Sequence, residues 1–191
     1  EAADFAKMEA AWQAYVDSAD PGADEMLYTR MGELAALPSR RGQIVVVAQK
    51  VSLTRLARLM DVSEKHEPRV HEIFKRLAVR CGAEYHEGPL KDAARVQQKA
   101  KNDYKNDFTK VVDVVRGTIE FDSIKSFICG IEILIEGGID VPDVLRAKDR
   151  LSPTTHINGL RDALLNLIVP DTDSLVVELQ LHFKKLHAIS E

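Results

Sequence analysis

The chain lacks the sequence features that mark disulfide-rich proteins, cysteine-ligated metal proteins and membrane-spanning proteins. Its 191 residues include only two cysteines, aromatic residues make up 6% of it, and no apolar run approaches the roughly 18–20 residues that cross a bilayer. Cys81 and Cys129 lack the CxxC or Cys/His spacing of a metal site and have apolar neighbours. We therefore expect two buried free thiols, a reducing compartment and no membrane partner.

Several common catalytic motifs are also missing. The sequence has no GxxxxGK(S/T) or GxGxxG loop, which disfavours a Walker-type or dinucleotide site, and it has no HExxH pattern or GxSxG elbow. The formal net charge of −4 argues against a protein that coats duplex DNA, because such proteins carry an excess of Lys and Arg. A local cationic pocket remains compatible with this charge.

Hydrophobic periodicity predicts that the first part of the chain is helical. Apolar side chains recur at helical spacing in three segments, residues 1–19, 23–37 and 68–81. We expect the second helix to stop at Pro38, and residues 43–60 fit a helix better than a strand. These segments together form a predicted helical region over residues 1–82.

From residue 83 onward, strand and helix patterns alternate in the order β-α-β-α-β-β-β. The predicted elements are a strand at 83–86, a helix at 91–104, a strand at 110–121, a helix at 124–135, and strands at 144–150, 164–169 and 175–183. Asp122 or Ser123 caps the second of these helices and Gly137 ends it. We predict an α+β fold, with a mixed sheet of about five strands flanked by helices at 83–191 and the region 1–82 packed on it.

The last predicted strand carries an unusual polar row. Its odd-numbered residues from Val177 to Phe183 are apolar, whereas Glu178, Gln180 and His182 share the opposite face. A strand that buries one apolar face has no structural need for a carboxylate, an amide and an imidazole in one line. Such a row is typical of the floor of an active site.

A second pattern is a line of cations on the strand 144–150. Arg146, Lys148 and Arg150 share one face and repel one another unless an anion lies between them. One interpretation is a solvated edge strand, where Lys and Arg are common. The other is a cradle for a polyphosphate, which Lys binds as a point charge and Arg binds with two parallel hydrogen bonds.

A third anomaly is Asp113, which interrupts the apolar run from Val111 to Val115. A carboxylate inside a strand is costly to desolvate unless it is paired or bound to a metal. The partner is either a cation such as Arg116 or a sheet lysine, or a divalent ion such as Mg²⁺ that Asp113 holds jointly with Glu178. Two carboxylates together with the line of cations on the strand 144–150 favour phosphoryl or nucleotidyl transfer over hydrolysis by a triad.

The segment from Gly88 to His182, about half of the chain, resembles the synthetase domain of the RelA/SpoT family, the enzymes that make the alarmone (p)ppGpp. Val112-Asp113-Val114-Val115-Arg116 is similar to the family's strand with a metal-binding Asp, and Val177-Glu178-Leu179-Gln180-Leu181-His182 is similar to its EVQI-type strand. Lys148-Asp149-Arg150, Pro153 and Asn158-Gly159 resemble its KDY…P…NGY segment. Gly88-Pro89-Leu90-Lys91 lies where the family has an Arg-x-Lys element that binds ATP.

The resemblance implies transfer of the β,γ-pyrophosphate of ATP to the 3′-hydroxyl of a nucleotide or RNA. Asp113 and Glu178 would be catalytic and would bind Mg²⁺, and Glu178 would also take the proton of the hydroxyl. ATP would be bound by seven cations, Lys91, Arg95, Lys99, Arg116, Arg146, Lys148 and Arg150. The acceptor would contact Asn158, Gly159, Leu160, Arg161, Gln180 and His182.

The chain departs from the family pattern at two positions that bear on substrate choice. Pro89 stands where the family has its first ATP-site arginine, and Leu160 stands where it has the tyrosine that stacks on the acceptor base. The acceptor is therefore left open between GTP or GDP, an adenosine nucleotide and the tRNA 3′ end, the last two being acceptors of toxin members of the family. We expect an antitoxin or regulatory protein as a partner, and a protein that is cytoplasmic or a delivered effector, because the chain shows no leader.

Two other functions stay open at this point. One is an inactive nucleotide-binding module that regulates a larger protein, which the changes at Pro89 and Leu160 favour. The other is an unrelated α+β interaction domain.

Overall fold

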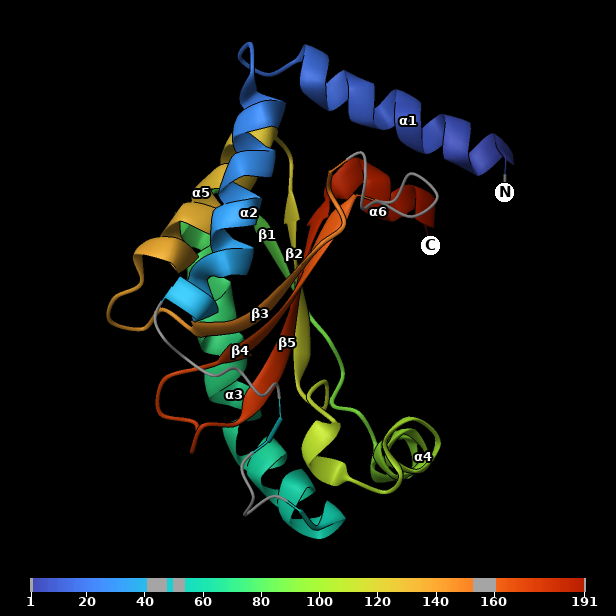
Figure 1. Cartoon of the computed structure of the whole chain (residues 1–191), viewed down its shortest axis with the longest axis vertical. Coiled ribbons are helices and arrows are strands. Elements are labelled where there is room, and N and C mark those ends of the chain that lie inside the picture. Colours follow the sequence, from blue (N-terminus) through green and yellow to red (C-terminus); the bar gives the residue numbers. More distant parts are fainter. Residues whose placement is uncertain (1, 41–47, 50–53, 153–160, 191) are drawn as a thin grey trace.

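The computed structural model describes residues 2–40, 48–49, 54–152 and 161–190. These residues form an α+β fold, as predicted (Figure 1). The helices are α1 (Ala2–Asp17), α2 (Ala23–Arg40), α3 (Leu56–Arg80), α4 (Ala93–Tyr104), the 3-10 helix η2 (Phe108–Lys110), α5 (Ile124–Glu136) and α6 (Lys184–Ser190). The strands are β1 (Glu84–Glu87), β2 (Arg116–Phe121), β3 (Asp143–Asp149), β4 (Asp162–Ile168) and β5 (Val176–Phe183).

The five strands make one mixed sheet in the order β1-β2-β5-β4-β3. Strands β2 and β5 pair in parallel at its centre, and the other neighbours are antiparallel. A parallel pair needs a long crossover, which here contains α5, β3 and β4. The predicted order of elements after residue 83 is thereby confirmed, and none of the helices in the described ranges has the length and apolar character to cross a membrane.

Helices α2, α3 and α5 lie on one side of the sheet and α6 lies on the other, while α4 lies beyond one end of the sheet and packs on η2 and α3 (Figure 1). Phe183 of β5 links three elements in the core, since its ring stacks on Phe127 of α5 at 4.8 Å and contacts Trp12 and Tyr15 of α1. Ser123 caps α5 by accepting a hydrogen bond from the Ser126 amide, one of the two caps that the sequence allowed. The apolar face of the sheet therefore forms one core with the N-terminal helices.

Two predicted helix boundaries are wrong, both at prolines. Helix α2 continues through Pro38 to Arg40, and α3 begins at Leu56 and contains Pro68, so it starts before the predicted 68–81 segment. Proline costs a helix interior about 3 kcal/mol. The buried stripe of α3, which runs from Leu59 to Ala78 on both sides of Pro68, offsets that cost by packing against the sheet. Residues 43–47, for which helix or strand was weighed, lie outside the described ranges.

A third correction concerns β2, which was predicted from residue 110 and begins at Arg116. The backbone just before it bonds to partners outside the sheet ladder: the Gln49 side chain donates to the Val111 carbonyl, and the Lys91 amide donates to the Val114 carbonyl. The β-branched run is buried as expected, but it is not a strand. Asp113 consequently precedes β2 and does not share its alternation.

The two cysteines are free thiols, as predicted. Cys81 is buried, and burial is the main reason that its thiol pKa rises to about 12, with Cys129 adding to the rise. Cys129 is only partly buried, so the predicted burial holds for one thiol of the two.

Two glycines provide a matched test of the packing of β1 on β2. A Cβ on Gly117 of β2 would clash with the Tyr85 side chain, whereas a Cβ on Gly32 of α2 meets nothing within 4 Å. We expect Gly117→Ala to lower the free energy of unfolding by about 1–3 kcal/mol and Gly32→Ala to raise it by about 0.5–1 kcal/mol. Denaturant unfolding of both variants checks this, and a stabilised Gly117→Ala would contradict the close contact of β1 with β2.

Candidate active site

Polar side chains cross the strands in three rows on the sheet face opposite α2, α3 and α5. Paired residues point to the same face of a sheet, so the register itself places these side chains together. The first row is Arg116, Glu178, Asn166 and Arg146; the second is His86, Thr118, Gln180 and Lys148, with Leu164 among them; the third is Glu84, Glu120, His182 and Asp162. We call this surface the polar face. The predicted line of Glu178, Gln180 and His182 lies at its centre, on β5.

Asp113 lies at the end of this face where β2 begins, and two lysines hold it. Both Lys91 and Lys99 place their Nζ atoms 2.5 Å from Asp113 Oδ2. Burial raises the pKa of the Asp113 carboxyl, but the two lysine hydrogen bonds outweigh burial and leave this pKa below its ordinary value. Neither lysine is the partner weighed from the sequence, where Arg116 or a sheet lysine was considered; Lys91 precedes α4 and Lys99 lies on it.

The other oxygen of Asp113 has no partner among the described residues. Asp113 Oδ1 is inaccessible to solvent and accepts no hydrogen bond there. A buried carboxylate oxygen in this condition is costly, which makes it a candidate ligand for a cation. Lys99 links this carboxylate to the first row: burial lowers the Lys99 pKa, while Asp113 and Glu178 raise it, and the net shift is upward. The structure thus brings Asp113, Lys99 and Glu178 into one electrostatic group.

A short segment between β1 and α4 lies against the start of β2 and positions Lys91. The Gly88 amide donates to the Arg116 carbonyl at 3.1 Å, and the Lys91 amide donates to the Val114 carbonyl at 3.0 Å. A Cβ on Gly88 would lie 2.7 Å from the Arg116 carbonyl oxygen, so this position needs glycine. Next to it, a cavity of about 180 Å³ is lined by Gly88, Pro89, Arg116, Gly117, Thr118 and Gln180. The Gly88–Lys91 segment therefore borders Arg116.

A chain of hydrogen bonds runs along β5 and orients Glu178. Gln180 Nε2 donates to Glu178 Oε1 at 2.9 Å, and His182 Nε2 lies 3.3 Å from Gln180 Oε1 and 3.6 Å from Asp162 Oδ2. Both neighbours of His182 Nε2 are acceptors, so this nitrogen carries the proton. Burial, reinforced by the nearby His187 and Arg150, lowers the pKa of His182 to about 4. His182 is therefore neutral at neutral pH and supports Glu178 through Gln180.

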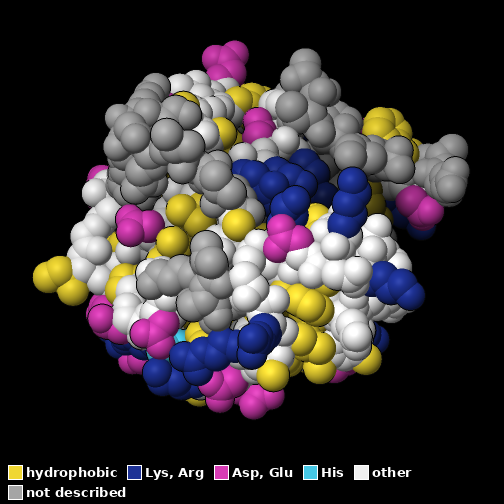
Figure 2. Space-filling view, turned by 60° about the horizontal axis from the view of Figure 1, so that its bottom comes forward, with side chains coloured by type: hydrophobic (Ala, Val, Ile, Leu, Met, Phe, Trp, Pro, Cys, Tyr) yellow, Lys and Arg dark blue, Asp and Glu magenta, His cyan; other side chains and the backbone are white. Residues whose placement is uncertain are grey.

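Arg146, Lys148 and Arg150, which lie on and just after β3, fit both interpretations that the sequence left open, a solvated edge strand and a phosphate cradle. Strand β3 is an edge strand of the sheet. Arg146 nevertheless donates from Nε and Nη2 to Asn166 Oδ1, and Arg150 Nη2 lies 2.5 Å from Asp162 Oδ2. Lys148 between them is exposed. Polar groups of β4 thus hold two of the three cations over the polar face. Figure 2 shows two gatherings of Lys and Arg side chains on the face that it presents, one above its middle and one near its lower edge.

Two of the other predicted residues, Arg95 and Arg161, are placed less centrally. Arg95 shares a face of α4 with Lys99 but is mostly exposed, 3.4 Å from Asp92, the residue that caps the helix. Arg161 is buried against α1: it donates to the Leu151 carbonyl and lies over the Trp12 ring at 4.7 Å. These contacts give Arg161 a structural role. The predicted acceptor residues Asn158, Gly159 and Leu160 lie outside the described ranges.

The sequence reasoning missed Asp162 and Asn166, which organise the polar face from β4. Both are buried, and burial raises the pKa of the Asp162 carboxyl although Arg150 opposes that rise. Asp162 Oδ1 and Asn166 Nδ2 have no hydrogen-bond partner within the described ranges. The sequence did contain a signal for them. Asp162 and Asn166 lie on the same face of the strand as Leu164, while the positions between them are apolar.

The buried imidazole of His182 predicts a loss of stability in mild acid. Its pKa is about 4 in the folded chain against 6.5 ordinarily, so between these pH values the unfolded chain binds a proton that the folded chain does not. Stability present above pH 6.5 therefore falls as the pH drops toward 4, by at most on the order of 3 kcal/mol from this residue. Urea unfolding across this range should show a shallower decline in His182→Gln than in the control His66→Gln, and equal declines would exclude a buried neutral His182.

Comparisons with known proteins support the fold. No family model matches the chain, and no curated protein sequence matches it. Among solved structures, the chain is similar to the type VI effector Tas1, solved in complex with its immunity protein, with a TM-score of 0.53 and 21% sequence identity. The match covers 67% of this chain and 61% of the Tas1 chain. At this identity the likeness establishes a common fold, and the chemistry has to be argued from the residues.

Proposed function

We propose that the chain transfers the β,γ-pyrophosphate of ATP to the 3′-hydroxyl of a nucleotide or RNA acceptor. The observation that carries this proposal is the buried Asp113 carboxylate, which two lysines hold through one oxygen while its other oxygen has no partner among the described residues. Glu178, a carboxylate with an ordered hydrogen-bond partner, acts on the same Lys99 ammonium group as Asp113. Two carboxylates and several cations at one end of a sheet suit phosphoryl transfer, which depends on positioning and charge neutralisation.

Several cations near Asp113 are available to bind the phosphates of ATP. Lys91 and Lys99 approach from α4 and the segment before it, and Arg116 lines the adjacent cavity of about 180 Å³. Arg146 continues the same row across Asn166. When a polyphosphate is present, the lysines can exchange their bonds to Asp113 for bonds to phosphate oxygens, because both partners are anionic oxygen acceptors.

The residues present fit a magnesium ion at Asp113 and Glu178. Mg²⁺ takes one or two carboxylates together with substrate phosphates and water, and the unpartnered Asp113 Oδ1 is a ligand of the required kind. When bound, Mg²⁺ supplies charge neutralisation on the phosphate oxygens.

In the proposed reaction, Glu178 accepts the proton of the acceptor 3′-hydroxyl. A bond forms between that oxygen and the β-phosphorus of ATP, and the bond from the β-phosphorus to the oxygen that bridges it to the α-phosphorus breaks. AMP leaves with the bridging oxygen. Gln180 holds Glu178 in place through its 2.9 Å hydrogen bond, and Arg116 and Lys99 neutralise charge that develops on the transferred group.

The fold likeness to a type VI effector favours a toxin-like role over housekeeping synthesis. In that role the chain would be delivered to a target cell and restrained in the producing cell by a dedicated protein. The altered position Leu160 fits an acceptor other than a guanine nucleotide, since leucine offers a base apolar contact but no aromatic face.

Glu178 provides the first test of the reaction. Incubation with Mg-ATP labelled in the γ-phosphate and with GTP, GDP, ATP or tRNA should give a labelled acceptor and AMP. Glu178→Gln should lower the rate about 10²–10⁴-fold, because the amide cannot take the proton, while Glu136→Gln at the exposed end of α5 should not change it. Undiminished product from Glu178→Gln would overturn the mechanism, and AMP without labelled acceptor would indicate hydrolysis in place of transfer.

Lys99 provides a separate test of nucleotide binding. Calorimetric titration with Mg-ATP should show Lys99→Ala binding about 10–100-fold more weakly, as expected for the loss of one charged hydrogen bond. Lys101→Ala, on an exposed position of the same helix, removes the same charge and should bind nearly normally. Equal weakening in both variants would show that only the net charge matters, which would contradict a phosphate site at Lys99.

A further inference from the structure

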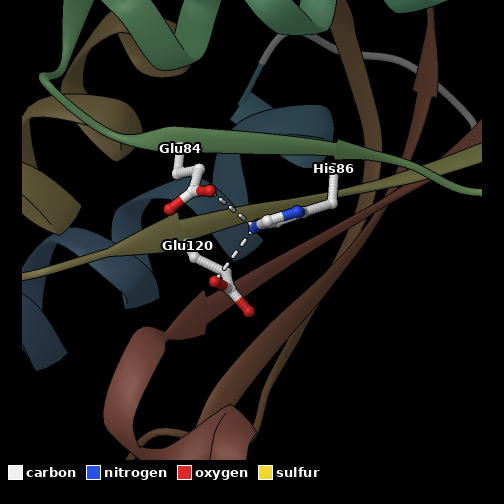
Figure 3. Close-up of side chains that lie close together, drawn as sticks. All are labelled: Glu84, His86 and Glu120. Atoms are coloured by element: carbon white, nitrogen blue, oxygen red, sulfur yellow. Dashed lines mark hydrogen bonds and ion pairs between the residues drawn. The ribbon is translucent and has the colours of Figure 1, made fainter.

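A second cluster of metal-ligating side chains lies at the other end of the polar face, where β2 ends. It consists of Glu84 and His86 on β1 and Glu120 on β2 (Figure 3). One ligand atom from each residue lies within 4.8 Å of the other two. His86 Nε2 is 3.0 Å from Glu120 Oε2 and 3.8 Å from Glu84 Oε1, so both carboxylates direct an oxygen toward the same imidazole nitrogen.

Each of the two carboxylates is also held from outside the cluster. His187 of α6 bonds through Nδ1 to Glu120 Oε1, and Lys184 Nζ lies 2.6 Å from Glu84 Oε2. These contacts use one oxygen of each carboxylate and leave the other oxygen facing His86. Such outer partners, which orient the groups that bind the ion, are a regular feature of metal sites.

The cluster has room for an ion and its remaining ligands. A cavity of about 420 Å³ is lined by His86, Thr118, Glu120, Lys184, His187 and Ala188. The side chain of Glu120 is 11% exposed, whereas that of His86 is 46% exposed, so the site opens to solvent on the His86 side. An ion can therefore enter from solvent and keep water molecules in its open positions.

The charge of the cluster favours a cation. Two carboxylates, Glu84 and Glu120, face a single ammonium group, Lys184, and the nearby Arg150 is already paired with Asp162. The two carboxylates thus outnumber the ammonium group that faces them, which favours the binding of a cation.

We propose that Glu84, His86 and Glu120 form a binding site for zinc or a similar divalent transition metal. An imidazole nitrogen with two carboxylates is a donor set for such metals, while Mg²⁺ prefers oxygen ligands alone. The site is thus chemically distinct from the carboxylates Asp113 and Glu178. Because its ligands come from an edge strand and its neighbour, and His187 holds Glu120, a bound ion fastens β1 to β2 and α6 to the sheet.

The test is a titration of the purified chain with ZnCl₂ in excess MgCl₂, which saturates sites made of oxygen alone. Calorimetry should show one zinc ion bound per chain and a zinc-dependent rise of the melting temperature. His86→Gln should weaken zinc binding at least about tenfold, and Glu120→Gln should do the same. The control His66→Gln, which removes an imidazole paired with Asp173 outside the cluster, should bind zinc like the parent chain.

A spectroscopic measurement separates ligation from a general effect on stability. Co²⁺ bound in place of zinc should give visible absorption bands that change in His86→Gln and persist in His66→Gln. If Glu120→Gln does not fold, the half-exposed His86 still carries the test. Absence of zinc binding in excess magnesium, or unchanged affinity and Co²⁺ spectrum in His86→Gln, would overturn the proposal. Neither result would bear on pyrophosphate transfer, which is measured separately with Glu178→Gln.

Discussion

The ion pairs of Asp113 with Lys91 and Lys99 hold together the parts of the molecule from which the site is built. They join the segment before β2 to α4 and to the turn that leads into it, at a place where the chain has not yet entered β2. Desolvating a carboxylate costs several kcal/mol, and the attraction of two nearby ammonium groups offsets that cost. Removing the carboxylate would leave two lysines close to one another, so each of the three groups depends on the others.

The same requirement for compensation shapes the rest of the polar face. A sheet that buries one apolar face against helices usually leaves its second face to solvent. Here Asp162, Asn166 and His182 are buried on the second face as well, and they are kept there by contacts with Arg150, Arg146 and Gln180. Such a network adds little net stability, but it fixes the orientation of every side chain in it. Glu178, Arg146 and Arg150 are therefore positioned before any ligand binds.

The sequence predicted what depends on local periodicity and missed what depends on tertiary partners. Alternation in β5 identified Glu178, Gln180 and His182, and the capped apolar stripe identified α5 almost to the residue. Two features went against the local sequence rules. Pro68 lies inside α3, where packing against the sheet offsets its cost, and β2 begins late because the Gln49 side chain bonds to the backbone before it. Asp162 and Asn166 could not be recognised as a network from one strand, since their partners lie on β3 and β5. The lysines that pair with Asp113 were named as phosphate ligands, but their pairing required the fold.

The charge of the proposed active site bears on how its ligands assemble. Lys91, Lys99 and Arg116 bring three positive charges to the two carboxylates Asp113 and Glu178, so the group is cationic by one charge before any ligand binds. A divalent cation alone is therefore poorly attracted, despite the unpartnered oxygen of Asp113. A polyphosphate reverses this balance, because it draws the lysines away from Asp113 and supplies the negative charge that a metal requires. The nucleotide and its metal are thus expected to bind as one unit, with Asp113 exchanging two lysine partners for one ion.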